Sequence, residues 1–190
     1  NDALNDARKV LYKATISLEE IVTNTIDIAY SDLYPYHESI SSIHIKRRYD
    51  IVKKLGLAIS MLKEAFGDNS KWKWSFVELE GRFATVAKNL IDMKSAVKDY
   101  FDPRAEDYET TVLYMRTIIR LLNESATAYR DKYELSTRRI DDMRNGIKYL
   151  LALRKLYLAI SDSTNAEEVK KKALVWKDKM DSDHKSGLSN

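Results

Sequence analysis

Cysteine is absent from this chain of 190 residues, and proline and glycine are scarce, with two and five residues respectively. Without cysteine there can be no disulfide, thiol catalysis, thiolate zinc site or attached c-type haem. Helix interiors tolerate proline and glycine poorly, whereas β-rich folds use both residues in their turns. The scarcity of both therefore favours an all-helical protein.

Long apolar runs and a recognisable leader are also missing. No run approaches the roughly 18–20 apolar residues that a membrane-spanning helix needs. No basic start followed by an apolar core indicates a signal peptide. The chain begins at Asn1 rather than at Met, and this start, together with the lack of cysteine, favours an exported or surface-exposed protein. The compartment itself stays open.

Charge of one sign does not dominate, because 32 basic and 29 acidic side chains give a net charge of +3. A protein that binds nucleic acid usually has a denser basic stripe, so we do not expect nucleic acid to be the main partner. The basic residues that would serve an anionic ligand are Arg138, Arg139, Arg144, Lys148, Arg154 and Lys155.

Signatures of catalysis and of cofactor binding are not found. The sequence has no G-x-S-x-G elbow, no G-x-G-x-x-G turn and no glycine-rich phosphate loop. It also lacks the Glu-x-x-His pairs of di-iron bundles. His37 and His44 lie two helical turns apart, so they share a metal only if another helix supplies further ligands. We therefore predict no enzyme activity, no metal site and no cofactor.

What the sequence does contain is a helical pattern. Four successive stretches carry apolar residues three and four positions apart, which places each set on one face of a helix. A seven-residue repeat favours the shallow left-handed crossings of long-helix bundles. We predict an all-α protein, an elongated antiparallel bundle of four long helices followed by one or two C-terminal helices. The first predicted face consists of Leu4, Ala7, Leu11, Ala14, Leu18, Ile21 and Ile28.

Turn and capping signals divide these stretches. The first helix is predicted from Asp2 to Ser31, and a turn at residues 32–37 follows because Pro35 disfavours helical geometry in the residue before it. The second helix is predicted from residues 39–42 onward to its cap at Gly67. The other two predicted starts are a capping box at Ser75 and Glu78, and Asp102 with Pro103.

The apolar pattern of the fourth helix continues far beyond the length of the others. One helix from Pro103 to Ile160 would be about 87 Å long, against about 40–45 Å for the earlier helices. Because helices of a bundle match in length, we predict a break within Asp131–Thr137, while the sequence leaves one long helix open. We further predict one domain over residues 1–181 and a flexible tail over residues 182–190.

Aromatic residues gather near the predicted turns. In an up-down bundle the first and third turns lie at the same end, and rings in turns are typical of interfaces. The alternative is that the rings plug the open ends of the bundle. The predicted partner-binding residues are Tyr30, Tyr34, Tyr36, Tyr100 and Phe101, and Trp72 and Trp74 form a second candidate patch at the opposite end.

These observations predict a non-catalytic structural or protein–protein interaction protein, such as a surface antigen, a virion or assembly component, or an adaptor. Its partner would be another protein or a second copy of the chain. One alternative is a carrier or sensor that holds a small molecule between helices, lined by Thr25 and Arg48, which interrupt the apolar faces. The other is a binder of nucleic acid or anionic surfaces that uses the six basic residues.

Overall fold

The computed structural model describes residues 2–67 and 70–188, and all regular elements in these two ranges are helices. This confirms the predicted all-α class. The chain forms two compact units, Asn1–Ile118 and Ile119–Asn190. That residues 1–181 act as one domain stays a prediction.

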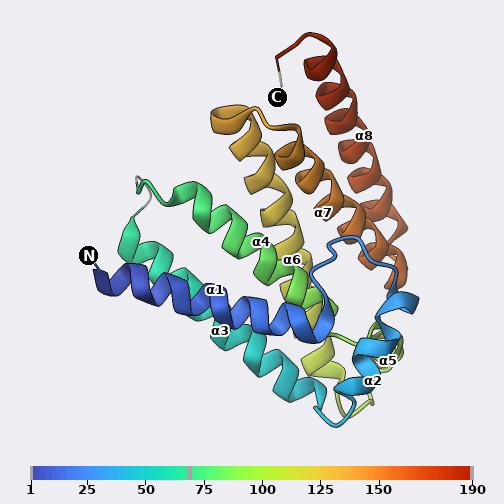
Figure 1. Cartoon of the computed structure of the whole chain (residues 1–190). Coiled ribbons are helices and arrows are strands. Elements are labelled where there is room, and N and C mark those ends of the chain that lie inside the picture. The colour runs from blue at the N-terminus through green and yellow to red at the C-terminus, as the bar shows by residue number, and fades with distance from the viewer. Residues whose placement is uncertain (1, 68–69, 189–190) are drawn as a thin grey trace. The chain divides into compact units, whose positions relative to one another are not determined.

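Helical elements follow one another along the described chain with short connections (Figure 1). Besides α-helices there are a 3₁₀ turn, η1, and a π-helical turn, η2. In order they are α1 (Asp2–Val22), η1 (Tyr30–Leu33), α2 (Tyr34–Ser39), α3 (Ile45–Phe66), α4 (Lys73–Asn89), α5 (Met93–Tyr100), α6 (Tyr108–Lys132), η2 (Tyr133–Thr137), α7 (Ile140–Ala159) and α8 (Ser163–Lys185).

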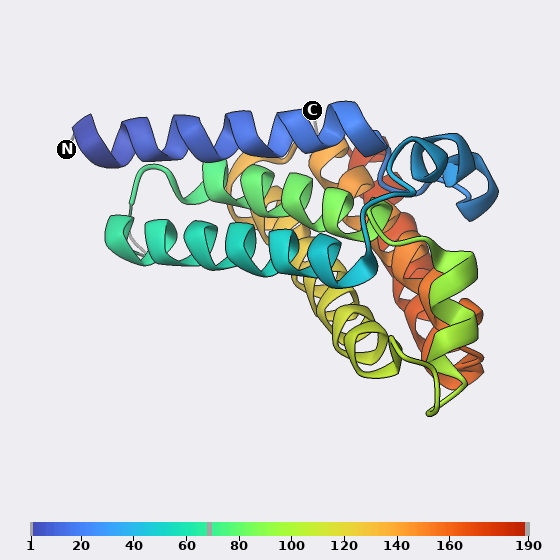
Figure 2. The ribbon, with the colours of Figure 1, turned by 90° about the horizontal axis from the view of Figure 1, so that it is seen from below.

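Helices α1, α3 and α4 lie side by side in the first unit, and α3 runs opposite to α1 and α4 (Figure 1, Figure 2). One row of apolar residues on α3 and one on α4 are buried. Burying each such side chain stabilises the fold by about 1.5–3 kcal/mol relative to leaving it exposed. These core residues are Val52, Leu55, Ile59 and Leu62 of α3, and Phe76, Leu79, Phe83 and Val86 of α4.

Helix α1 ends at Val22, well before the predicted end at Ser31. Thr23 has a φ of 65°, in the left-handed region, which stops the helix. The side chain of Asn89 then holds the departing backbone, because its Nδ2 donates to the carbonyls of Thr23 and Thr25 at 3.0 and 3.3 Å. A side chain distant in sequence therefore holds the backbone at the end of α1.

The predicted turn at residues 32–37 is replaced largely by helix. Elements η1 and α2 follow each other there, and Pro35 occupies the first turn of α2. Proline fits that position because its fixed φ is helical and the first turn needs no amide donor. The second predicted helix therefore starts later, as α3 at Ile45, and it ends before Gly67, whose φ of 78° agrees with the predicted cap.

The third predicted helix is two helices in the structure, α4 and α5. Asp92 separates them, because its carboxylate accepts from the amide of Lys94 at 3.2 Å and from the hydroxyl of Ser95 at 2.8 Å. These bonds satisfy donors at the start of α5. The apolar register runs through the break, so the pattern of apolar residues does not reveal it.

Two predicted helix starts are wrong. Helix α4 begins at Lys73 rather than at Ser75, whose hydroxyl bonds to side chains of α1 instead of capping α4. Helix α6 begins at Tyr108 rather than after Asp102. The carboxylate of Asp102 accepts from the amide of Arg104 within a turn that precedes the helix. Ser75 thus serves a contact between two helices and Asp102 a local turn, and neither starts a helix.

The guanidinium of Arg48 joins α3 to the C-terminal end of α4. Arg48 is only 7% exposed, and its Nη1 donates to the carbonyl of Leu90 at 3.0 Å. Its Nη2 and Nε donate to the carbonyls of Ile40 and Ile43 at 2.8 and 2.7 Å. Arginine stays charged in such surroundings, so these bonds are stronger than those between neutral groups. The residue that interrupts the apolar pattern of α3 thus ties three backbone segments together.

Two further side chains bind carbonyls at the same end of α4. The buried hydroxyl of Tyr114 in α6 donates to the carbonyl of Ala87 at 2.8 Å. His37 of α2 lies with its Nε2 2.8 Å from the carbonyl of Asn89, to which it donates. The last carbonyls of a helix have no intrahelical donor and need one from elsewhere. Here α2, α3 and α6 supply the donors, so the end of α4 connects the elements of the first unit.

We expect Arg48→Met to lower the free energy of unfolding by several kcal/mol. Three carbonyls lose their charged donor, and each buried polar group left unsatisfied costs about 1–3 kcal/mol. Urea denaturation followed by circular dichroism measures the loss. Arg47→Met is the matched control, because Arg47 is the exposed neighbour and its replacement should change little. Equal stability of the two variants would contradict the role given to Arg48.

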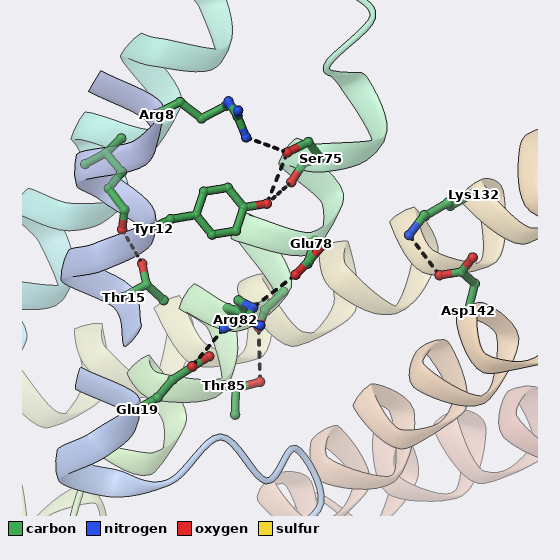
Figure 3. A network of polar contacts seen from close by, with 12 residues as sticks. Arg8, Tyr12, Thr15, Glu19, Ser75, Glu78, Arg82, Thr85, Lys132 and Asp142 are labelled. Carbon is green, nitrogen blue, oxygen red and sulfur yellow. Dashed lines mark hydrogen bonds and ion pairs between the residues drawn. The ribbon is translucent and has the colours of Figure 1, made fainter. Parts of the chain in front are cut away.

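The fourth predicted helix breaks within residues 131–137, as the sequence predicts. Helix α6 passes at Lys132 into the π-helical turn η2, and Arg138 follows with a left-handed φ of 51°. Asp142 of α7 accepts from the hydroxyl of Thr137 at 2.6 Å and pairs with the Nζ of Lys132 at 2.9 Å (Figure 3). One carboxylate therefore closes the turn between α6 and α7.

Gly146 lets α7 pack closely against α6 in the second unit. Although Asn145 and Gly146 form a common turn dipeptide, α7 is helical throughout. A Cβ atom at Gly146 would lie 3.1 Å from the carbonyl oxygen of Ala126 in α6 and 3.4 Å from the ring of Trp176 in α8. Glycine is needed here for close approach of two backbones rather than for a turn.

The last helix, α8, includes part of the predicted tail. It continues to Lys185, and the buried Asp183 in its last turns accepts from the hydroxyl of Tyr133 at 2.8 Å. Lys179 pairs with the same carboxylate at 3.1 Å. The bond from Tyr133, together with that from Lys179, lowers the pKa of Asp183 below its usual value. Residues 182–185, which the sequence predicts to lie in a flexible tail, are therefore part of α8.

We expect Gly146→Ala to destabilise the second unit by about 1–3 kcal/mol, the usual cost of overpacking a core. In a helix without this contact the same change would stabilise by about 1 kcal/mol, because alanine is the better helix former. The midpoint of thermal unfolding shows the sign directly. Asn145→Ala is the control at the neighbouring, half-buried position. A Gly146→Ala protein with a raised midpoint would disprove the close approach.

Candidate partner-binding surfaces

Helix α1 carries apolar residues on two sides, and only one side is covered. Leu11 and Leu18 of the first predicted face are half-buried, whereas Ala14 and Ile21 of the same predicted face are exposed. Ala14 follows Leu11 by three residues, and Ile21 follows Leu18 by three residues. A step of three residues places two side chains about 60° apart around the helix. The single face predicted from the sequence is therefore two faces in the structure.

The exposed residues form a continuous row, which we call the outward face of α1. Val10 is 62% exposed and Ile21 is 41% exposed. The residues between them are small, so another helix could approach closely along this row. A contiguous exposed apolar surface on a helix is typical of an interaction site. The outward face consists of Ala3, Ala7, Val10, Ala14, Ser17 and Ile21.

A different side of α1 makes polar bonds to the start of α4 (Figure 3). The hydroxyl of Tyr12 donates to the carbonyl of Ser75 at 2.7 Å. Nη1 of Arg8 donates to the hydroxyl of the same serine at 3.1 Å. Burial raises the pKa of Tyr12 above its usual value, which keeps its hydroxyl protonated as a donor. These directional bonds hold α1 at one rotation about its axis.

An ion pair further along the two helices has the same effect. Arg82 of α4 lies 2.9 Å from Oε2 of Glu19 and 3.2 Å from Oε1 of Glu78 (Figure 3). Glu19 is nearly buried, and burial raises its pKa while the charge of Arg82 opposes the rise. The charged carboxylate is favourable only while it faces Arg82. Rotation of α1 would break the pair, so the outward face keeps pointing away from α4.

Two charges of opposite sign border the outward face along one edge. Lys13 and Glu20 lie one heptad apart, and both are exposed. Among the residues that the structure describes, neither has an ion-pair partner. Asp6 and Lys9 on the same helix, by contrast, pair with each other at 3.0 Å. Lys13 and Glu20 are therefore free to pair with charges on another molecule.

The five aromatic residues predicted as a partner surface differ in exposure. Tyr34 is 64% and Phe101 is 54% exposed, while Tyr30, Tyr36 and Tyr100 are half-buried. Burial raises the pKa of Tyr30 strongly. Tyr100 and Phe101 contact each other edge to face, with ring centres 5.3 Å apart. Whether these residues bind a partner stays a prediction.

The five rings do not join into one cluster. His37 of α2 lies 3.9 Å from the carboxylate of Asp92, which precedes α5. Phe101 follows the opposite end of α5, about 12 Å further along the helix axis. Among the described residues no ring contact links Tyr100 or Phe101 to the tyrosines near α2. Within the described residues, His37 near the first predicted turn thus lies beside the start of α5, whereas Tyr100 and Phe101 of the third predicted turn lie at its other end.

The second candidate patch is partly covered by side chains of its own unit. The guanidinium of Arg8 stacks on Trp72, 4.0 Å from the ring centre, and the ammonium of Lys71 lies 5.4 Å from it. Lys73 lies 5.1 Å from the ring of Trp74. Both tryptophans are half-buried. Arg8 thus uses Trp72 as part of the packing between α1 and α4.

The six basic residues predicted for an anionic ligand lie before or on α7. Four of them are exposed, and Arg154 and Lys155 are half-buried. Arg138 stacks near the ring of Tyr133, with 5.8 Å to the ring centre, and Arg144 pairs with Asp141. The six residues are therefore spread along the helix with partners of their own at several positions. The exposed ones are Arg138, Arg139, Arg144 and Lys148.

Other kinds of site find no support in the part of the chain that the structure describes. It holds no group of three or more histidine, aspartate or glutamate side chains that could bind a metal ion. Within the same residues, no helix has the length and apolar character to cross a membrane.

The described residues form an all-α protein of two helical units, in which α1 turns a row of apolar and small residues outward. The chain belongs to the TP0443 family, whose model matches residues 1–184. No curated protein and no solved structure matches it.

Sequence reasoning missed the outward face of α1, although a signal for it exists. Val10 and Ser17 lie outside the predicted apolar face, yet they share a second register of threes and fours with Ala7, Ala14 and Ile21. A helix with two such registers needs neighbours on two sides. In the first unit, other helices cover only one of these two sides of α1.

We expect Tyr30→Ser to lower the free energy of unfolding by about 1–3 kcal/mol, because a half-buried ring is lost. Tyr34→Ser should change it by less than about 0.5 kcal/mol, as is usual for exposed residues. Urea denaturation separates the two readings of the aromatic residues. Loss of stability in both variants would make Tyr34 an end plug, and loss in neither would leave Tyr30 free to serve a partner.

Proposed function

We propose that this chain is a non-catalytic protein–protein interaction protein that binds a helix of its partner along the outward face of α1. The observation that carries the proposal is the exposure of Val10 and Ile21 in one continuous row of apolar and small residues on a helix that polar bonds hold in place. Such spacing of three and four residues is how amphipathic helices recognise each other. The proposed role therefore follows from a surface that the chain leaves uncovered.

The dimensions of the outward face suit a helical partner. From Ala7 to Ile21 it extends about 21 Å along the axis, or nearly four turns. The central residues Ala14 and Ser17 are small, which permits a short distance between helix axes, while Val10 and Ile21 supply the larger apolar contacts. The bonds that Arg8, Tyr12 and Glu19 make to α4 hold α1 rigid, which limits the ordering cost of binding.

The two alternative functions have less support. In the carrier alternative, Arg48 and Thr25 would line a ligand site, but Arg48 donates to three carbonyls and the carbonyl of Thr25 accepts from Asn89. In the anion-binding alternative, Arg144 would serve the ligand, but it pairs with Asp141. Arg48, Thr25 and Arg144 thus have structural uses within their own unit.

A photo-crosslinking experiment in the cells that make the protein tests this proposal. Benzoylphenylalanine replaces Val10 in one variant and the exposed Lys171 of α8 in a control. We expect a discrete adduct from position 10 and none from position 171. Adding Ala14→Glu, which places a charge in the middle of the outward face, should abolish the adduct. Equal labelling at positions 10 and 171, or an adduct that survives Ala14→Glu, would refute the proposal.

A further inference from the structure

The charges that border the outward face of α1 indicate which helix it binds. We propose that the occupant is α1 of a second copy of this chain, packed antiparallel about a two-fold axis between Thr15 and Ile16. The inference rests on the proposed function and names its partner. An isologous pairing of this kind presents the same surface from both copies, so the face must be complementary to itself.

The apolar residues of the outward face are complementary to themselves in this arrangement. Positions whose numbers add up to 31 face each other across the axis. Val10 then contacts the partner's Ile21, and Ala14 contacts the partner's Ser17. Symmetry repeats both contacts, so the largest apolar residues lie at the two ends of the interface and the smallest at its centre. This allows the helices to approach closely where they cross.

The charges agree with the same register. On the flank that carries Lys13 and Glu20, an antiparallel helix pair brings Lys13 beside the partner's Glu20, and symmetry repeats this pair. Both side chains are exposed, and neither has an ion pair among the described residues. On the other flank the half-buried Leu11 lies beside the partner's Leu18, which extends the apolar contact.

Other registers are less favourable. A shift by one heptad toward the N-terminus sets Lys13 against the partner's Lys13, and Asp6 against the partner's Glu20. A second such shift pairs Asp6 with the partner's Lys13, but Asp6 already pairs with Lys9, and the contacts of Ile21 are lost. A parallel pairing leaves Lys13 beside the partner's Leu18 with no charge to meet. Only the proposed register satisfies both free charges.

Charge reversal tests the pairing in the purified chain. Sedimentation equilibrium should show a dimer that forms with increasing concentration. Lys13→Glu alone and Glu20→Lys alone should each weaken it about ten-fold, because two ion pairs become like-charge contacts. The double variant Lys13→Glu with Glu20→Lys should recover the original affinity, since the pairs are restored with exchanged signs. Lys171→Glu, a reversal on exposed α8, should leave the affinity unchanged.

Disulfide trapping tests the register. Because the chain has no cysteine, two introduced cysteines are the only thiols. Val10→Cys with Ile21→Cys should give a covalent dimer on oxidation, since these positions meet across the axis but lie about 16 Å apart within one helix. Ala7→Cys with Ser17→Cys is the matched control, because these positions meet only in the register shifted by one heptad. Preferential trapping of the control pair would overturn the proposed register.

The outcomes separate this inference from the proposed function. A chain that stays monomeric at millimolar concentration, or a double charge swap that fails to restore the dimer, refutes self-association. If Val10 then crosslinks in cells to a different protein and Ala14→Glu prevents it, the proposed function stands and the inference about the second copy is wrong. Circular dichroism of each variant confirms that the helices are intact.

Discussion

Most of the first unit depends on how the terminal carbonyls of α4, which are buried, find hydrogen-bond donors. Arg48, Tyr114 and His37 reach this end from three other helices, and each donates to a backbone carbonyl there. A helix end buried without donors would cost several kcal/mol, so these elements cannot separate without a large penalty. Apolar packing holds the helices side by side, but these polar bonds decide where α4 stops and where α2 and α3 begin to pack.

The same division of roles explains why α1 keeps an apolar side exposed. Leu11 and Leu18 pack inward, yet the rotation of α1 is held by Arg8, Tyr12 and Glu19 through bonds to α4. Apolar contact is tolerant of rotation, whereas hydrogen bonds and ion pairs are directional. The polar contacts therefore turn a second apolar row toward the solvent, and the proposals for this chain concern that row.

The sequence predicts the periodic features well, and the structure shows why it misses the others. The apolar row of α3 that begins at Val52 and that of α4 that begins at Phe76 are buried, and the break after α6 falls where matched helix lengths place it. The interruption at Asp92 and the end of α1 at Thr23 escape prediction because they depend on side-chain bonds to one residue, not on a repeating pattern. Of the candidate sites, the aromatic residues could be named but not their arrangement, since that depends on where α5 begins.

The bond between Tyr133 and Asp183 has a consequence for how the chain is made. A protein is synthesised from its N-terminus, and its domains generally fold as units in that order. Residues 1–118 provide everything that the first unit contains, so it can form while synthesis continues. The hydroxyl of Tyr133, by contrast, bonds to the carboxylate of Asp183, fifty residues later in the chain. The second unit therefore completes its structure only after residue 183 has left the ribosome, and truncated products that lack the last turns of α8 should be recognised by proteases as incompletely folded.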